Sequence, residues 1–220
     1  ALDSEYTPEK LNAYEIGSKL QFWQQQASLH VAAFYYDYES QQVFVNMTSG
    51  IAPYHVLKNA GDSTIYGIET EFVYTPTSNI QMNFNVGYLP KANMGSYRDG
   101  DITVNDNRLP FSSEWNVSGY FLHEVEVMGG VLTSLLNFDY QSDFYVDQNE
   151  NPYTEQKSFT VFNGDITFQA NDNLAFSLWG KNLTNTEHSE LRFDSTAALA
   201  TVTELKAEGR QIGAGITYSF

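Results

Sequence analysis

The segment IQMNFNVGY, residues 80–88, alternates apolar and polar positions without a break. Its apolar positions carry Ile, Met, Phe, Val and Tyr, and the positions between them carry Gln, Asn, Asn and Gly. Successive side chains of an extended chain point to opposite faces of a sheet. The segment therefore predicts a β-strand with one apolar face and one face that is polar or small.

The same period of two extends through most of the chain, including TIYGIETEFVY (residues 64–74) and QIGAGITYSF (residues 211–220). No stretch of the sequence shows convincingly the spacing of apolar residues that is typical of an amphipathic helix. Nine strand-forming stretches are predicted, at about 11–25, 27–46, 63–75, 79–89, 113–125, 130–145, 157–170, 173–183 and 208–220. The fold class is therefore all-β.

Short and long connections alternate strictly between these stretches. The short ones lie near residues 26, 77, 128 and 172, and the long ones cover about 47–62, 90–112, 146–156 and 184–207. All six prolines fall in connections or at strand ends, where no ladder hydrogen bond is lost. A soluble sandwich has no reason to keep its long loops on one side.

Alternating loop lengths and alternating faces together indicate an antiparallel up-and-down transmembrane β-barrel, whose turns are short in the periplasm and long outside the cell. A sheet in lipid must pair every backbone amide, so its apolar face points outward. The expected location is the outer membrane of a Gram-negative cell. Bacterial single-chain barrels have even strand numbers. Nine strands therefore predict that residues 1–220 are the C-terminal part of a larger barrel.

Composition excludes several other classes. A net charge of −16 argues against nucleic acid as a partner, because such binding neutralises phosphates with Lys and Arg. No cysteine is present, which excludes a disulfide framework, a thiolate zinc site and a catalytic thiol. The longest apolar runs are about six residues, whereas a membrane-spanning helix needs roughly twenty. The N-terminus shows no signal-peptide pattern, so either the protein is not exported or its beginning is missing.

Five short motifs, in order along the chain, resemble those of TonB-dependent outer-membrane receptors. Pro8-Glu9 with Tyr14-Glu15, Gly17 and Lys19 is similar to the family's "PE…YE-G-K" strand. Asn59-Ala60-Gly61 before Tyr66-Gly67-Ile68-Glu69-Thr70-Glu71 resembles its "NAG…GxExE" strand, and Leu109-Pro110 its "LP" strand entry. Asn182-Leu183-Thr184-Asn185 resembles "NLTN", and Gly209-Arg210 opens a last strand with an aromatic end. The chain departs from the pattern at Glu187-His188 and in the Ala-rich stretch 196–200.

The resemblance implies about nine strands of a 22-stranded barrel, with further strands, a plug domain and a TonB box preceding this chain. It implies active uptake of a ferric siderophore or a similar scarce nutrient, energised by the TonB complex through the plug. The implied partners are that nutrient complex, TonB, the outer-membrane assembly machinery and the lipid bilayer. Three alternatives stay open: uptake of a non-iron nutrient such as cobalamin or an oligosaccharide, a small porin or adhesin barrel, and a soluble sugar-binding β-domain.

Candidate ligand contacts lie in the long loops, where aromatic and Arg side chains stack on or pair with an anionic, planar chelator. They are Tyr97, Arg98, Tyr145, Tyr153, Arg192 and Phe193. The terminal Tyr218 and Phe220 resemble the signal that hands a barrel to the assembly machinery. An ordinary aromatic strand end at the membrane interface is the other interpretation.

The polar side chains predicted on the inner, lumen face are expected to meet water or the plug rather than to catalyse a reaction. They are Glu15, Lys19, Glu69, Glu71, Asn137, Asp139, Asn163 and Asp165. No Ser-His-Asp set, P-loop or GxGxxG stands in the required context, so neither an enzyme nor catalytic residues are expected. The four histidines have no metal-ligand spacing. No cofactor or protein-bound metal is expected, and any iron arrives as a chelate.

Overall fold

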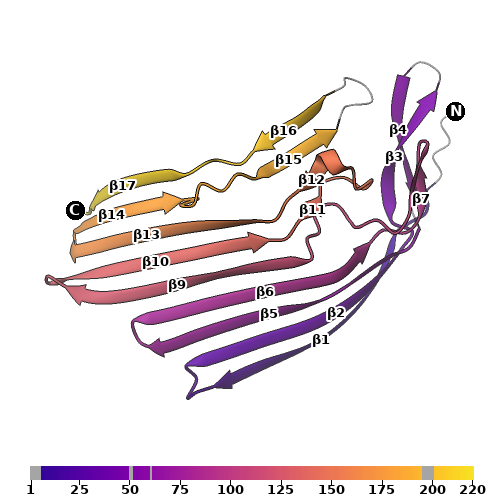
Figure 1. Cartoon of the computed structure of the whole chain (residues 1–220). Helices are drawn as coiled ribbons and strands as arrows, with labels where there is room; N and C mark the ends of the chain where they lie inside the picture. The colour runs from indigo at the N-terminus through magenta and orange to yellow at the C-terminus, as the bar shows by residue number, and fades with distance from the viewer. Residues whose placement is uncertain (1–5, 50–51, 60, 195–200) are drawn as a thin grey trace.

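The structure is a computed structural model that describes residues 6–49, 52–59, 61–194 and 201–220, so the Ala-rich stretch 196–200 lies outside the described residues. Its main element is an antiparallel nine-stranded sheet in which sequence neighbours pair (Figure 1). The strands are β1 (Lys10–Phe22), β2 (Ala27–Glu39), β5 (Ser63–Thr77), β6 (Ile80–Asn93), β9 (Trp115–Val127), β10 (Gly130–Gln141), β13 (Phe159–Asn171), β14 (Leu174–Lys181) and β17 (Gln211–Tyr218).

The nine predicted strands are confirmed, and so is the up-and-down order. The four short turns lie together at one end of the sheet with the C-terminus, and the long connections lie at the other end (Figure 1). In the described residues β1 and β17 are the two edges and do not pair with each other. The closure that a self-contained nine-stranded barrel requires is therefore not present in this sheet.

Several strand boundaries were predicted wrongly. The stretch 27–46 is not one strand, because Ser40 adopts a positive φ of 57° and the chain turns there between β2 and β3 (Gln42–Ser49). The stretch 130–145 is likewise divided, since β10 ends at Gln141. Each turn lies in a short polar run, at residues 39–42 and 141–143, across which the predicted strands were extended because apolar residues resume directly after it.

Each long connection contributes to a small two-stranded sheet of its own. These are β3 with β4 (Ala52–Asn59), β7 (Tyr97–Asp99) with β8 (Ile102–Val104), β11 (Phe144–Tyr145) with β12 (Glu155–Gln156), and β15 (Ser189–Asp194) with β16 (Val202–Lys206). The short helix η1 (Pro152–Thr154) precedes β12. Loop backbone amides are thus paired within the loops themselves, as buried amides require.

The apolar face of the sheet is exposed. Ile16 of β1, Ala33 of β2 and Ile68 of β5 lie side by side in one register row that continues to Tyr88 and Trp115. Ile16 is 76% exposed. Such a surface is stable next to lipid rather than water, which fits the predicted outward face of a transmembrane barrel.

Aromatic side chains mark two levels on this face. Tyr14, Tyr35 and Tyr66 are register neighbours near the long loops, and Phe22 and Trp23 lie near the short turns. Tyr14 and Phe22 are eight positions apart, which is about 26 Å of strand and, at a tilt of ~40°, about 20 Å of height. That is close to the ~25 Å apolar band between the aromatic girdles of outer-membrane barrels.

The compact hydrophobic core of the described residues lies in the loops rather than in the sheet. Val43 and Val45 of β3 and Met94 after β6 are buried together, with Tyr97 and Leu109 packed against them. Water-excluding packing therefore stabilises the loops as a unit.

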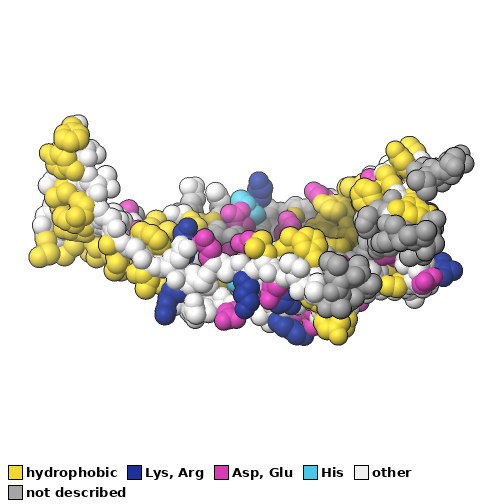
Figure 2. Space-filling model, turned by 90° about the horizontal axis from the view of Figure 1, so that it is seen from above, with side chains coloured by type: hydrophobic (Ala, Val, Ile, Leu, Met, Phe, Trp, Pro, Cys, Tyr) yellow, Lys and Arg dark blue, Asp and Glu magenta, His cyan; other side chains and the backbone are white. Residues whose placement is uncertain are grey.

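In the view from above, charged side chains gather over the middle of the molecule, and hydrophobic ones predominate at the end with the short turns (Figure 2).

Candidate functional site

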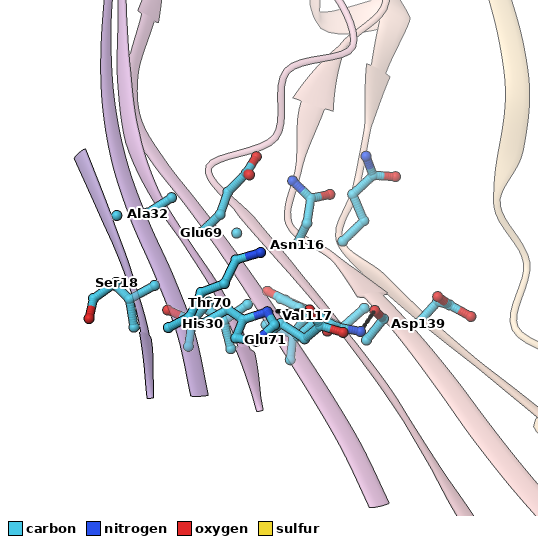
Figure 3. Close-up of a pocket in the computed structure, with 18 of the residues that line it drawn as sticks. Ser18, His30, Ala32, Glu69, Thr70, Glu71, Asn116, Val117 and Asp139 are labelled. Carbon is cyan, nitrogen blue, oxygen red and sulfur yellow. Dashed lines mark hydrogen bonds and ion pairs between the residues drawn. The ribbon is translucent and has the colours of Figure 1, made fainter. Parts of the chain in front are cut away.

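The inner face of the sheet contains a hollow of about 880 Å³ (Figure 3). Its floor follows one register row, in which Gly17, Ala32, Glu69 and Gly87 are successive neighbours on β1, β2, β5 and β6. Two of these residues have no side chain and one has a single methyl group. The Glu69 side chain therefore stands over a floor of nearly bare backbone.

The next row along the sheet carries further charged side chains of the hollow besides Glu69. Lys19, His30, Glu71 and Asn85 are register neighbours, and the row continues through Ser118 to Asp139. The His30 Nδ1 atom lies 3.3 Å from the Glu71 Oε2 atom. Every side chain predicted on the inner face shares this face in the register of the strands, so that prediction is confirmed.

The inner face presents polar side chains. Within the described part of the chain no group of three or more His, Asp or Glu side chains is arranged to hold a metal ion. The inner row offers carboxylates, amides and hydroxyls to whatever fills the lumen. These groups recognise basic or hydrogen-bonding surfaces.

The loops at the other end of the strands are joined to one another by side-chain hydrogen bonds. Gln148 Nε2 donates to the backbone carbonyl of Phe44 at 3.1 Å and to Asp99 Oδ2 at 3.3 Å, and Asn149 Nδ2 donates to the same Asp99 oxygen at 3.1 Å. Asp99 is only 3% exposed. Three loops that are far apart in sequence thus form one body, which we call the loop cap: β3–β4, β7–β8 and β11–β12.

Sequence reasoning missed this connection. Gln148 and Asn149 lie in a polar stretch that predicts only a solvated loop. No local pattern identifies a partner about fifty or a hundred positions away, so the signal for the loop cap is tertiary.

The six predicted ligand residues fall into two groups in the structure. Tyr153, Phe193 and Arg98 are exposed on the loops, Tyr153 at 62% and Phe193 at 56%. Tyr97 is packed against the loop core, and its hydroxyl is buried without a hydrogen-bond partner. Burial and the nearby carboxylates of Asp99 and Asp147 raise the pKa of Tyr97, so this phenol stays neutral. Ligand binding by all six residues, Tyr145 and Arg192 included, stays a prediction.

Arg192 connects two loops. Its Nη2 atom lies 2.9 Å from Glu204 Oε1 across the β15–β16 hairpin, and its Nη1 atom donates to the Glu155 carbonyl of β12. Ser189 Oγ also donates to Glu204. The Ser189 hydroxyl and the Arg192 guanidinium hold the pKa of Glu204 below its ordinary value of 4.5.

We expect the β15–β16 hairpin to loosen in acid. Because the folded-state pKa of Glu204 is lowered, its stabilising contribution is fully present above pH 4.5 and is lost as pH falls through the lowered value. The loosening is measured by hydrogen exchange of peptides covering Ser189–Asp194, with the rates corrected for the intrinsic effect of pH. Glu204→Gln removes the charge, so its exchange should already match the acid form at neutral pH. A wild-type pH response in Glu204→Gln would contradict the assignment.

The Asn182-Leu183-Thr184-Asn185 motif closes the outer end of β14. The Asn182 side chain donates to the Thr186 and Glu208 carbonyls at 2.9 and 3.2 Å and accepts from the Thr186 amide at 2.8 Å. Asn182 has a positive φ of 47°, which Asn tolerates better than most residues. The motif therefore has a structural role, as the hydrogen-bonded turn from which the last long loop starts.

Fold and site together define a class, the wall of an outer-membrane β-barrel with a polar lumen and a capped outer end. A family model described as TonB dependent receptor-like, beta-barrel, matches residues 3–183. The chain belongs to this family of TonB-dependent receptors, and its location is the outer membrane. The family is one of receptors, not enzymes, so the expectation that the chain is not an enzyme is confirmed.

Solved structures share the fold. The ferric yersiniabactin uptake receptor FyuA from Yersinia pestis superposes with a TM-score of 0.79 at 18% identity, over 98% of this chain and 30% of that one. The siderophore receptor PiuA from Acinetobacter baumannii gives 0.73 at 20% identity, over 96% and 29%. The copper transporter OprC gives 0.70 at 14% identity, over 98% and 32%. The chain spans about 30% of the length of the receptors that it matches.

No curated protein sequence matches the chain. Among the described residues, no helix has the length and apolar character to cross a membrane.

Proposed function

We propose that the full-length protein carrying this chain is an outer-membrane active-transport receptor, which takes up a ferric siderophore or a similar scarce nutrient with energy supplied through TonB. The family match over residues 3–183 carries this proposal. Structural neighbours named as ferric yersiniabactin and siderophore receptors support it. A neighbour named as a copper transporter keeps a non-iron nutrient, such as cobalamin or an oligosaccharide, as the alternative.

Residues 1–220 are, in this proposal, the C-terminal part of the barrel, and the plug and the remaining strands belong to the rest of the protein. The neighbours' greater length supports this division. The carboxylates of Glu69 and Glu71, which lie on adjacent register rows of the inner face, suit contact with basic groups of a plug inside the lumen. Iron would enter as a chelate, with no cofactor resident in the protein.

Nutrient contact is proposed at the exposed loop residues. Tyr153 and Phe193 present their rings to solvent, which suits stacking on a planar chelator. Arg98 supplies an exposed cation that can pair with an anionic chelator. Tyr97, Tyr145 and Arg192 are proposed to shape the same surface, since Arg192 connects the β15–β16 hairpin to β12 beside η1.

Assembly is proposed to begin at the aromatic C-terminus. Tyr218 ends β17, and its ring packs edge-to-face with that of Phe220 at 5.2 Å. Both rings are exposed at the end of the sheet that carries the short turns. An exposed edge strand with an aromatic end is suited to recognition by strand pairing.

Uptake of radiolabelled iron tests the proposal. Cells expressing the full-length protein would receive iron on catecholate, hydroxamate and phenolate chelators in turn, with labelled cobalamin as the non-iron probe. We expect uptake of one probe to depend on the receptor and to stop when TonB is deleted. Receptor-independent uptake of every probe, or uptake that persists without TonB, would overturn it.

A paired variant tests the loop contacts. Tyr153→Ala with Phe193→Ala should weaken binding of the transported chelate by about tenfold or more, because each stacked ring contributes roughly 0.5–1.5 kcal/mol. Tyr14→Ala is the matched control, since Tyr14 is a similarly exposed ring on the lipid-facing side of β1. Equal weakening in both variants would contradict a loop binding site.

A further inference from the structure

One short stretch of the β11–β12 loop, residues 147–156, contacts each of the other three hairpins of the outer loops, and we call it the linking segment. Toward the loop cap, Gln148 Nε2 donates to the Phe44 carbonyl of β3 and to the carboxylate of Asp99 in β7. Asn107, which follows β8, donates to the Gln148 carbonyl at 3.1 Å. Gln148 is therefore bonded to the loop cap through its side chain and through its backbone.

The linking segment is bonded to β15 as well, at three successive places. The bonds are those of Asn151 Nδ2 with Asp194 Oδ2, of the Glu155 carbonyl with Arg192 Nη1, and of Gln156 Oε1 with the Ser189 amide. The last of these measures 2.9 Å, and both of its residues are buried. The partners follow one another in antiparallel order, so the linking segment and β15 lie side by side.

The linking segment is also folded tightly on itself. Thr154 is only 1% exposed, and it donates from its hydroxyl to Asp147 and from its amide to the Asn151 carbonyl. Asp147 also accepts from the Asn149 amide at 2.7 Å. The residues that bind β3 and β7 are thus fixed to those that bind β15.

The chain of contacts continues to the residues that precede β1. Asn59 Oδ1 accepts from the Thr7 amide at 2.7 Å, and Asn59 Nδ2 donates to the Thr7 carbonyl at 3.0 Å. Glu9 Oε1 accepts from the Gln42 amide at 2.6 Å. Glu9 and Asn59 belong to the first two sequence motifs, which therefore join the β3–β4 hairpin to the segment before β1.

We propose that these outer loops open as one cooperative unit, held together by the linking segment, rather than one loop at a time. Release from β7 breaks bonds to the buried carboxylate of Asp99, and release from β15 breaks the buried bond between Gln156 and Ser189. A buried polar group left without a partner costs more than the bond itself contributes. Opening that frees a single loop therefore has this cost without the full gain in chain entropy, and joined elements open together.

One consequence concerns transport and rests on the proposed function. Tyr153 lies in η1, inside the linking segment, and its ring is exposed. A ligand that binds only the closed form of a unit stabilises the whole unit by mass action. A nutrient stacked on Tyr153 would thereby hold the β3–β4 and β7–β8 hairpins closed as well.

Hydrogen exchange of the nutrient-free, full-length receptor in detergent tests the proposal. Gln148→Ala removes the side-chain bonds to β3 and β7, and among the described residues Gln148 makes no hydrogen bond to β15. We expect exchange to rise about tenfold or more in residues 42–45 and 97–99, and by the same factor in residues 189–194. A rise confined to residues 42–45 and 97–99, or no rise at all, would overturn the cooperative unit.

Arg192→Gln is the reciprocal variant, because the Arg192 guanidinium binds the linking segment from β15. It should raise exchange in residues 42–45, and an effect limited to residues 189–194 would count against the proposal. Asn105→Ala is the matched control, since the Asn105 side chain accepts its bond from Ser96 of the same loop, at 2.7 Å. A general rise in Asn105→Ala would show that the linking segment is not what joins the loops.

All variants must keep the heat-dependent gel mobility of a folded barrel, and exchange in residues 115–127 of β9 should stay at the wild-type rate. These measurements need no nutrient, so their failure leaves the transport proposal intact. Adding the iron chelate or cobalamin that the cells take up should slow exchange of the wild type in residues 42–45. Unchanged exchange there would overturn the consequence for transport alone.

Discussion

Replacing Gly67 with valine is expected to remove nearly all assembled receptor from the outer membrane. A β-carbon at this position would lie 2.5 Å from the Tyr88 carbonyl oxygen and 2.9 Å from the Phe34 ring. The β5–β6 register shifts at this point, between Tyr66 and Ile68, so the backbone of β6 is already fitted against Gly67. Moving that backbone would cost more than about 3 kcal/mol. Heat-dependent gel mobility of the full-length protein measures the folded fraction.

Gly87→Val provides the control on the neighbouring strand. A β-carbon at Gly87 would meet only Asn116, at 3.8 Å, because this glycine lies on the floor of the inner hollow. This variant should assemble close to wild-type level. Normal assembly of Gly67→Val, or equal loss in both variants, would show that close backbone approach at Gly67 is not the constraint.

Replacing Asn182 with alanine is expected to destabilise the barrel by about 2–4 kcal/mol. Asn182 is 4% exposed, and its side chain makes three hydrogen bonds to backbone groups of Thr186 and Glu208. Alanine would leave those groups without partners and would also tolerate the positive φ less well. Guanidinium unfolding of the full-length receptor in detergent measures the change.

Asn105→Ala is the comparison for this effect. Asn105 is exposed, and its side chain accepts one hydrogen bond, from Ser96 Oγ at 2.7 Å. Its loss should change stability by less than about 0.5 kcal/mol. A similar small change in Asn182→Ala would mean that solvent satisfies the turn and that the motif has no structural role.

Most of the sheet could be predicted because its causes are local. Alternation within residues 80–88 and 64–74 follows from lipid on one side and a polar lumen on the other, and each strand records both environments in its own sequence. The inner-face residues, Glu69 and Glu71 among them, were therefore placed correctly before any register was known. The predicted strand was extended across the turn at Ser40, although residues 39–42 are all polar, because apolar residues resume at Val43.

The candidate site could be predicted only as a region. Aromatic and Arg residues in long connections indicate a binding surface, but their individual roles depend on partners elsewhere. Tyr97 turns out to pack on the loop core, and Arg192 turns out to bridge two loops, whereas Tyr153 and Phe193 are exposed. Composition does not distinguish these environments, since the packed Tyr97 lies between Ser96 and Arg98 much as the exposed Phe193 lies between Arg192 and Asp194.

By itself, the sequence determined the strand period, the two faces, the order of short and long connections and, through its motifs, the family. These properties follow from steric alternation and from the solvent on each face, which act over a few residues. Tertiary structure alone decided the loop cap and the inner hollow. Each depends on register and on contacts such as Gln148 with Phe44, which join residues 104 positions apart. Side chains so distant in sequence meet only after the strands have paired.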